Sequence, residues 1–213
     1  MEGKVVLYFS IGKNNFEITQ KLLESGANPN SGSNVLDWAL FRSDVEIIKT
    51  LIMYGAKVTQ PTFGFTTLQG DPEIVQIMLD HGADLKNYDI LDVVVSRGHL
   101  EVLKVLLKHG VDLNRYTCIH RVPLHNAIGK NRPEIVSELL KNGANPYLPD
   151  FSGITPIHYA TKFPCDLKVF LNLGLPLDLN IRNNNEETVL ETALRRGWKD
   201  TAKMIFHHNH NKF

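Results

Sequence analysis

The chain has 213 residues, of which 43% are hydrophobic, and its 23 basic and 23 acidic side chains give a formal net charge of zero. This balance supplies no general field toward nucleic acid or an anionic membrane, so we expect neither as a partner. The two cysteines, Cys118 and Cys165, form no CxxC pair. We therefore expect a reducing, cytoplasmic compartment and no disulfide framework or structural zinc site.

A glycine phrase recurs along the chain. Its glycines are Gly26, Gly55, Gly82, Gly110 and Gly143, with a degenerate sixth copy at Gly174. Nine positions before each of the first five lies a glutamate, followed by a branched apolar residue and then, four residues later, by an apolar pair. This spacing places the apolar residues on one helical stripe, and the glycine suits the left-handed residue that commonly ends a helix. The pattern predicts a short amphipathic helix before each glycine.

A second helix signal precedes most of these helices. Residues 155–160 read Thr-Pro-Ile-His-Tyr-Ala and residues 123–127 read Pro-Leu-His-Asn-Ala, with weaker versions at 34–39, 89–94 and 188–193. Two-helix units are therefore predicted, and they start near Val5, Asn34, Pro61, Asp89, Val122, Thr155 and Thr188.

The connections between units differ in length. From the helix-ending glycine to the next start, the first three measure 8, 6 and 7 residues and the last three 12, 12 and 14. The first three are too short for a full hairpin finger, whereas the last three predict one. In the third unit, Gly64 and Gly70 predict a short or irregular first helix, because glycine costs roughly 1 kcal/mol relative to alanine. In the sixth unit, Pro164 predicts a distorted turn between the helices.

The phrases and the helix stripe recur in phase, and the chain resembles the ankyrin-repeat family along essentially its whole length. The resemblance implies an all-α solenoid of about seven helix-turn-helix units, in a single domain over residues 1–213 whose first and last units act as caps. It also implies a non-enzymatic adaptor, inhibitor or host-directed effector. Such a module binds a partner protein through its concave face and fingers, and we expect a monomer without cofactors. The short units resemble viral and intracellular-bacterial members, which would place the protein in a host cytoplasm.

The fingers supply the candidate partner-binding residues, because turns tolerate variation and Arg and Tyr are enriched in binding hot spots. These candidates are Arg115, Tyr116, His120, Arg121, Tyr147, Phe151 and Arg182. For Tyr147 and Phe151 the alternative is packing against their own finger. The family resemblance further implies asparaginyl hydroxylation at Asn30 and Asn114, each eight residues after a leucine.

The alternative function is a small metal-dependent enzyme or regulator that uses Cys118, His120 and His125. These residues are close in sequence but have no recognised metal-ligand spacing, so we predict no metal site. His125 and His158 occupy the histidine of the repeat phrase, where the side chain is expected to fix a turn by hydrogen bonding. Neither a glycine-rich phosphate loop nor a nucleophile elbow occurs in the sequence, and we assign no catalytic residue.

Overall fold

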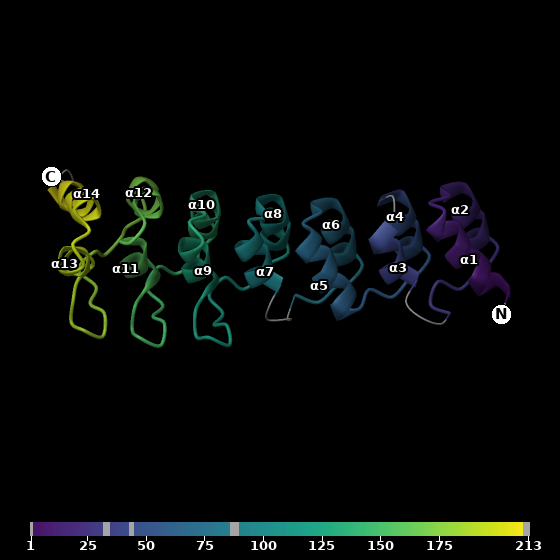
Figure 1. Cartoon of the computed structure of the whole chain (residues 1–213), viewed down its shortest axis with the longest axis horizontal. Helices are drawn as coiled ribbons and strands as arrows, with labels where there is room; N and C mark the ends of the chain where they lie inside the picture. The colour runs from purple at the N-terminus through teal and green to yellow at the C-terminus, as the bar shows by residue number, and fades with distance from the viewer. Residues whose placement is uncertain (1, 32–34, 43–44, 86–89, 211–213) are drawn as a thin grey trace. The chain divides into compact units, whose positions relative to one another are not determined.

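The computed structural model describes residues 2–31, 35–42, 45–85 and 90–210 (Figure 1). Over these ranges the chain forms fourteen helices and no strand. It divides into two compact units, an N-terminal unit, Met1–Ile90, and a C-terminal unit, Leu91–Phe213. The single domain and its capping units stay a prediction.

The N-terminal unit contains three helix pairs. They are α1 (Glu2–Gly12) with α2 (Phe16–Glu24), α3 (Val35–Arg42) with α4 (Val45–Met53), and α5 (Gln60–Gln69) with α6 (Pro72–Asp80). The first helix begins three residues before the predicted start at Val5. The second helices α2, α4 and α6 pack on one another in order, as do the first helices α1, α3 and α5.

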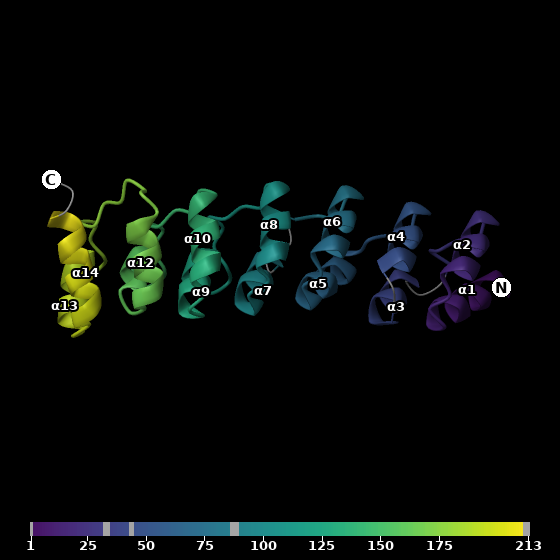
Figure 2. The ribbon, with the colours of Figure 1, turned by 90° about the horizontal axis from the view of Figure 1, so that it is seen from above.

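The C-terminal unit contains four helix pairs. They are α7 (Ile90–Arg97) with α8 (Leu100–Lys108), α9 (Pro123–Gly129) with α10 (Pro133–Lys141), α11 (Pro156–Ala160) with α12 (Pro164–Asn172), and α13 (Val189–Arg195) with α14 (Lys199–His210). Within this unit the first helices lie in one row and the second helices in another (Figure 1). Figure 2 shows from above that the successive pairs of this unit lie side by side. This is the helix-pair architecture that the repeat pattern predicts.

The glycines end the second helices as predicted. The six glycines of the repeat phrase have φ between 66° and 92°, the left-handed region that a side chain disfavours. In the fifth copy, the amide of Gly143 donates to Leu140 O at 3.2 Å and that of Ala144 to Leu139 O at 3.0 Å. These bonds satisfy carbonyls that the end of the helix leaves without partners.

The prediction of a short first helix in the third pair is wrong. Helix α5 has ten residues and passes through Gly64, and Gly70 ends it in the left-handed conformation. Its buried face carries Phe63, which is 0% exposed. Burying such a side chain contributes more than the roughly 1 kcal/mol that one glycine costs. In the sixth pair, α11 has only five residues, and Pro164 lies in the first turn of α12 rather than between the two helices. The distorted turn stays a prediction.

Three hairpin fingers precede the last three helix pairs, and we call residues 111–122, 144–155 and 175–188 fingers one, two and three. The tip of finger one closes with Thr117 N donating to Arg121 O at 2.8 Å and His120 N donating to Thr117 O at 2.9 Å. Equivalent bond pairs, at 2.9 to 3.0 Å, close fingers two and three. The third residue after the first donor is left-handed in each, namely His120, Gly153 and Glu186. The predicted fingers are confirmed.

The shorter connections differ from these fingers. Residues 54–59, between α4 and α5, are fully described and form no hairpin. The other two short connections include residues 32–34 and 86–89, which lie outside the described residues.

One carboxyl group lies in the core of the C-terminal unit. Asp166 on α12 is 0% exposed, and neither of its oxygens has a hydrogen-bond partner among the described residues. Asp166 lies eight positions before Gly174. In most other repeats, the residue eight positions before the glycine is a buried branched apolar side chain, such as Ile135. Burial, with a smaller contribution from Glu134, raises the pKa of Asp166 to about 6. The folded state therefore favours the neutral acid.

Candidate protein-interaction surface

Two buried histidines fix the bases of the fingers. Nε2 of His125 lies 2.9 Å from the carbonyl oxygen of Ile154 in finger two, and Nε2 of His158 lies 3.1 Å from that of Glu187 in finger three. Burial lowers the pKa of both imidazoles, so each is neutral and donates its single N–H to a carbonyl. The predicted structural role of these histidines is confirmed, and it joins each first helix to the next finger.

Three of the predicted partner-binding residues form one aromatic stack. The His120 ring lies 4.3 Å from the Tyr116 ring in finger one and 4.3 Å from the Phe151 ring in finger two, with interplanar angles of 16° and 23°. Phe151 is nonetheless 74% exposed. It therefore packs against the neighbouring finger rather than its own, and it presents a large apolar face to solvent.

Arg121 lies beside this stack and faces the first helices. Its guanidinium is 3.6 Å from the Asp150 carboxylate and 5.3 Å from the centre of the Tyr159 ring. The group is thus held by an ion pair and a cation–π contact, both of which cross from finger one to the next repeat. Arg115 is half-buried at the start of finger one.

Two other predicted residues make contacts that stabilise the fingers. The hydroxyl oxygen of Tyr147 accepts a hydrogen bond from Asp178 N at 2.7 Å, which ties finger two to finger three. Arg182 donates to the carbonyl oxygen of Glu186 and lies 3.5 Å from the Glu191 carboxylate. These bonds show that Tyr147 and Arg182 stabilise the fingers. Their role in partner binding stays a prediction.

The predicted hydroxylation sites bridge neighbouring repeats. The amide of Asn30 donates to Gly55 O at 2.7 Å, and its Oδ1 accepts from the second amide after that glycine at 2.9 Å. Asn114 makes the equivalent bonds to Gly143 O at 3.4 Å and to the second amide after it at 2.7 Å. The two asparagines are therefore structurally equivalent, and their hydroxylation stays a prediction.

The geometry does not favour the alternative metal site. Both ring nitrogens of His125 are engaged, because Nδ1 accepts from Val122 N at 3.4 Å while Nε2 donates to Ile154 O. The His120 ring lies in the aromatic stack. Within the described residues, no three His, Cys, Asp or Glu side chains come together as a metal-ligand group.

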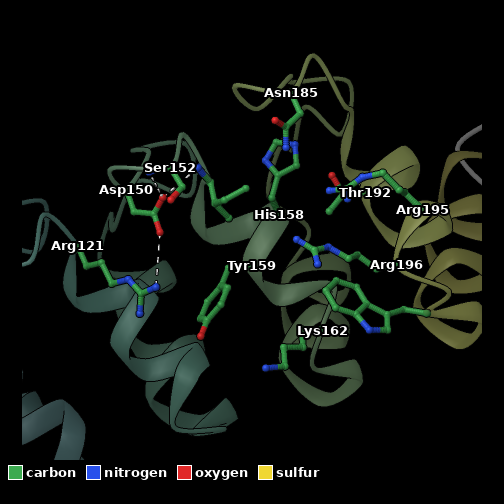
Figure 3. A pocket seen from close by; sticks show the side chains of 12 residues that line it. Arg121, Asp150, Ser152, His158, Tyr159, Lys162, Asn185, Thr192, Arg195 and Arg196 are labelled. Carbon is green, nitrogen blue, oxygen red and sulfur yellow. Dashed lines mark hydrogen bonds and ion pairs between the residues drawn. The ribbon is translucent and has the colours of Figure 1, made fainter.

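A pocket that the repeat pattern does not predict lies next to the fingers. Its cavity of about 470 Å³ is bounded by fingers two and three, α11, α13 and the segment after α13 (Figure 3). Besides Arg121, its lining includes Tyr159, Lys162, Arg195, Arg196 and Trp198, and we call these six residues the basic pocket. In Figure 3, Tyr159 lies between Arg121 and Arg196.

The ion pairs of the basic pocket are unevenly distributed. Arg121 is paired with Asp150, and Arg195 with Glu187, to which its Nη2 donates at 3.0 Å. Within the described part of the chain, Lys162 and Arg196 take part in no ion pair. His158 also lines the cavity, but burial keeps it neutral. Lys162 lies over the Phe163 ring at 5.4 Å, and the charge of Arg196 helps to lower the pKa of Glu187. Both cations are exposed and can still pair with a carboxylate of a ligand.

Comparison with known proteins agrees with this architecture. A family model described as ankyrin repeats in three copies matches residues 65–150 and 124–213. The ankyrin-repeat domain of Bcl-3, described as a unique member of the IkappaB protein family, superposes with a TM-score of 0.74 at 23% identity and covers 93% of this chain and 97% of that one. The ankyrin-repeat domain of human ASB11 gives a TM-score of 0.65 at 22% identity, covering 87% and 90%.

Sequence relatives match shorter stretches. NF-kappa-B inhibitor alpha of Sus scrofa is 38% identical over 93 residues, which cover 41% of this chain and 30% of that protein. NF-kappa-B inhibitor alpha of Rattus norvegicus is 43% identical over 86 residues, which cover 38% of this chain and 27% of that protein. A putative ankyrin repeat protein of fowlpox virus, FPV223, is 41% identical over 44 residues, which cover 21% of this chain and 31% of that protein. Each match thus spans under a third of the relative's length.

No helix among the described residues is both long and apolar enough to cross a bilayer. The family match covers well over half of the chain, and the helix pairs, left-handed glycines and fingers are those that the repeat pattern predicts. The chain belongs to the ankyrin-repeat family, whose members act as protein-interaction modules.

Proposed function

We propose that this chain is a non-enzymatic module that binds a partner protein through its finger face, by which we mean fingers one to three together with the exposed side of α9, α11 and α13. The observation that carries the proposal is the stack of Tyr116, His120 and Phe151, in which Phe151 is 74% exposed. A large aromatic side chain held in place by its neighbours loses little entropy on binding, which is typical of an interface anchor.

The scaffold beneath the stack supports the same role. The buried histidines donate to finger carbonyls, and Tyr147 ties finger two to finger three. Positions held by such bonds present a pre-formed surface, so binding requires little ordering of loops. The exposed residues of the fingers are then free to match a partner.

Among adaptor, inhibitor and host-directed effector, the similarity to NF-kappa-B inhibitor alpha supports an inhibitor that covers a partner's surface. The similarity to a fowlpox virus protein supports a host-directed setting. Cys118 and Cys165 are both free and exposed, which suits the reducing cytoplasm that we propose as the site of action.

The test starts from partners captured by cross-linking in a cell extract, followed by affinity measurement with the purified partner. The double variant His120→Ala, Phe151→Ala removes the stack from the finger face. Its matched control is Phe206→Ala, His207→Ala, which removes an exposed ring pair from α14. We expect at least about a tenfold loss of affinity in the first variant and about no change in the second.

Equal affinity of the two double variants for every captured partner would show that the aromatic stack does not anchor the partner, and the proposal would lose the observation that carries it. Circular dichroism of both variants verifies that the helices are intact. The two substitutions in each variant lie at exposed or half-buried positions, so folding is expected to survive.

A further inference from the structure

The charge of the basic pocket contrasts with the neutrality of the whole chain. The sequence balances 23 basic against 23 acidic residues, yet four of the pocket's lining residues are cationic. Asp150 and Glu187 neutralise two of them, Arg121 and Arg195. The remaining two positive charges, on exposed side chains at one cavity, give this part of the finger face a local positive potential.

The pocket also has an aromatic wall. Tyr159 and Trp198 are half-buried and line the cavity together with the cations. The Arg121 guanidinium lies over the Tyr159 ring, which fixes the orientation of that wall. A ligand that fits must therefore offer negative charge to Lys162 and Arg196 and apolar surface to the rings, which a small inorganic anion alone does not.

The size of the cavity points in the same direction. About 470 Å³ lies within the range of sites that enclose a small organic ligand or several side chains of a peptide. The pocket adjoins the stack along the chain, because the lining residue Arg121 follows His120 and the lining residues Asp150 and Ser152 flank Phe151. A partner that contacts the stack can therefore also reach the pocket.

We propose that the basic pocket binds an acidic segment of the partner protein, in which neighbouring Asp or Glu carboxylates pair with Lys162 and Arg196 and an apolar side chain packs on Trp198. This inference rests on the proposed function and specifies the chemistry of the partner. The carboxylates meet two cations that form no ion pair within the described chain, so the desolvation of the pair is offset by new charge-assisted hydrogen bonds.

The probe for the test is a short fluorescein-labelled peptide of alternating glutamate and leucine, and fluorescence anisotropy measures its binding to the full chain. The double variant Lys162→Glu, Arg196→Glu reverses the charges in the pocket. The control, Lys141→Glu, Lys203→Glu, makes the same change in net charge at exposed positions on α10 and α14.

We expect wild-type binding to weaken as salt rises, and the pocket variant to lose at least about tenfold in affinity while the control loses less than about twofold. Binding should also change the fluorescence of Trp198, and an analogous lysine–leucine peptide should not bind. Equal affinity of the two variants, or equal binding of the lysine peptide, would overturn the inference. Tighter binding of a single-stranded oligonucleotide with the same variant pattern would also overturn it, in favour of nucleic acid.

The captured partner separates this inference from the proposed function. If that partner loses affinity in the stack variant but binds the pocket variant and its control alike, the acidic-segment inference is wrong and the proposed function holds. If it binds both the stack variant and the pocket variant as well as the wild type, the proposed function is wrong.

Discussion

Replacing the buried carboxyl of Asp166 should stabilise the protein at neutral pH. The pKa of this group is about 6 in the folded chain against an ordinary value of 3.8. Between those values the folded state binds more protons than the unfolded state, so wild-type stability falls as the pH rises through this window and stays at the lower level above it. Asparagine has nearly the same size and never ionises, so Asp166→Asn removes this loss.

The magnitude follows from the shift. A rise of about two units in pKa corresponds to about 3 kcal/mol of free energy between the neutral and the charged form. We therefore expect Asp166→Asn to raise the free energy of unfolding by about 2 to 3 kcal/mol near pH 7.5 and by about zero near pH 4. The unpaired polar group itself remains in the variant, so the effect reports the charge alone.

Urea unfolding followed by far-ultraviolet circular dichroism at both pH values measures the difference. Asp200→Asn, at an exposed position on α14, is the matched control and should change the free energy of unfolding little at either pH. Glu134→Gln should lower the pKa of Asp166, because it removes the nearby carboxylate that helps to raise it. A gain for Asp166→Asn that is the same at both pH values, or a loss near pH 7.5, would refute the reasoning.

Three further changes test the scaffold. Tyr147→Phe removes the acceptor of Asp178 N and should cost about 1 kcal/mol in urea unfolding, whereas no loss would mean that fingers two and three are not joined by this bond. Gly153→Ala places an alanine in the left-handed conformation, with its Cβ overlapping Asn184, and should lower the free energy of unfolding by about 1 to 2 kcal/mol. Glu186→Ala, at the equivalent position of finger three, should change the free energy of unfolding by almost nothing. Equal losses in the two variants would contradict this account. Leu139→Ala in the core of α10 should cost about 2 to 5 kcal/mol, and a loss below about 1 kcal/mol would show that α10 is not tightly packed.

The helix pairs and fingers could be predicted because their signals are local. A glycine at a fixed distance after an amphipathic stripe defines where a helix ends, and the number of residues to the next phrase decides whether a hairpin fits. The extent of α5 could not be predicted in this way, because the burial of Phe63 depends on neighbouring helices and outweighs the cost of Gly64. Propensity is a weak guide where tertiary packing competes with it.

The candidate site was predicted only in part for a related reason. Tyr116, His120 and Phe151 are finger residues, so turn chemistry identified them, but their stacking across two fingers depends on how neighbouring repeats pack. Lys162 and Arg195 were missed although a signal exists, since each lies seven positions after the threonine that begins its repeat phrase. Comparing exposed positions between repeats, rather than searching the fingers alone, would have found them.

Asp166 carried a signal of the same kind. It stands at the position where Ile47, Ile74, Val102 and Ile135 supply the core, so a carboxylate there could be recognised from the repeat alignment alone. Its burial could not, because a degenerate repeat can also turn such a residue toward solvent. The structure settles this point by leaving the side chain with no exposed surface.

The finger tips are closed by main-chain hydrogen bonds, and the left-handed position is filled by His120 in one finger, Gly153 in the next and Glu186 in the third. Tip geometry is therefore compatible with very different side chains. The sequence at each hairpin tip can therefore be substituted, or replaced by that of another hairpin, while the helix pairs keep their packing. The fingers can therefore acquire new binding specificities one at a time, and each successive variant still folds.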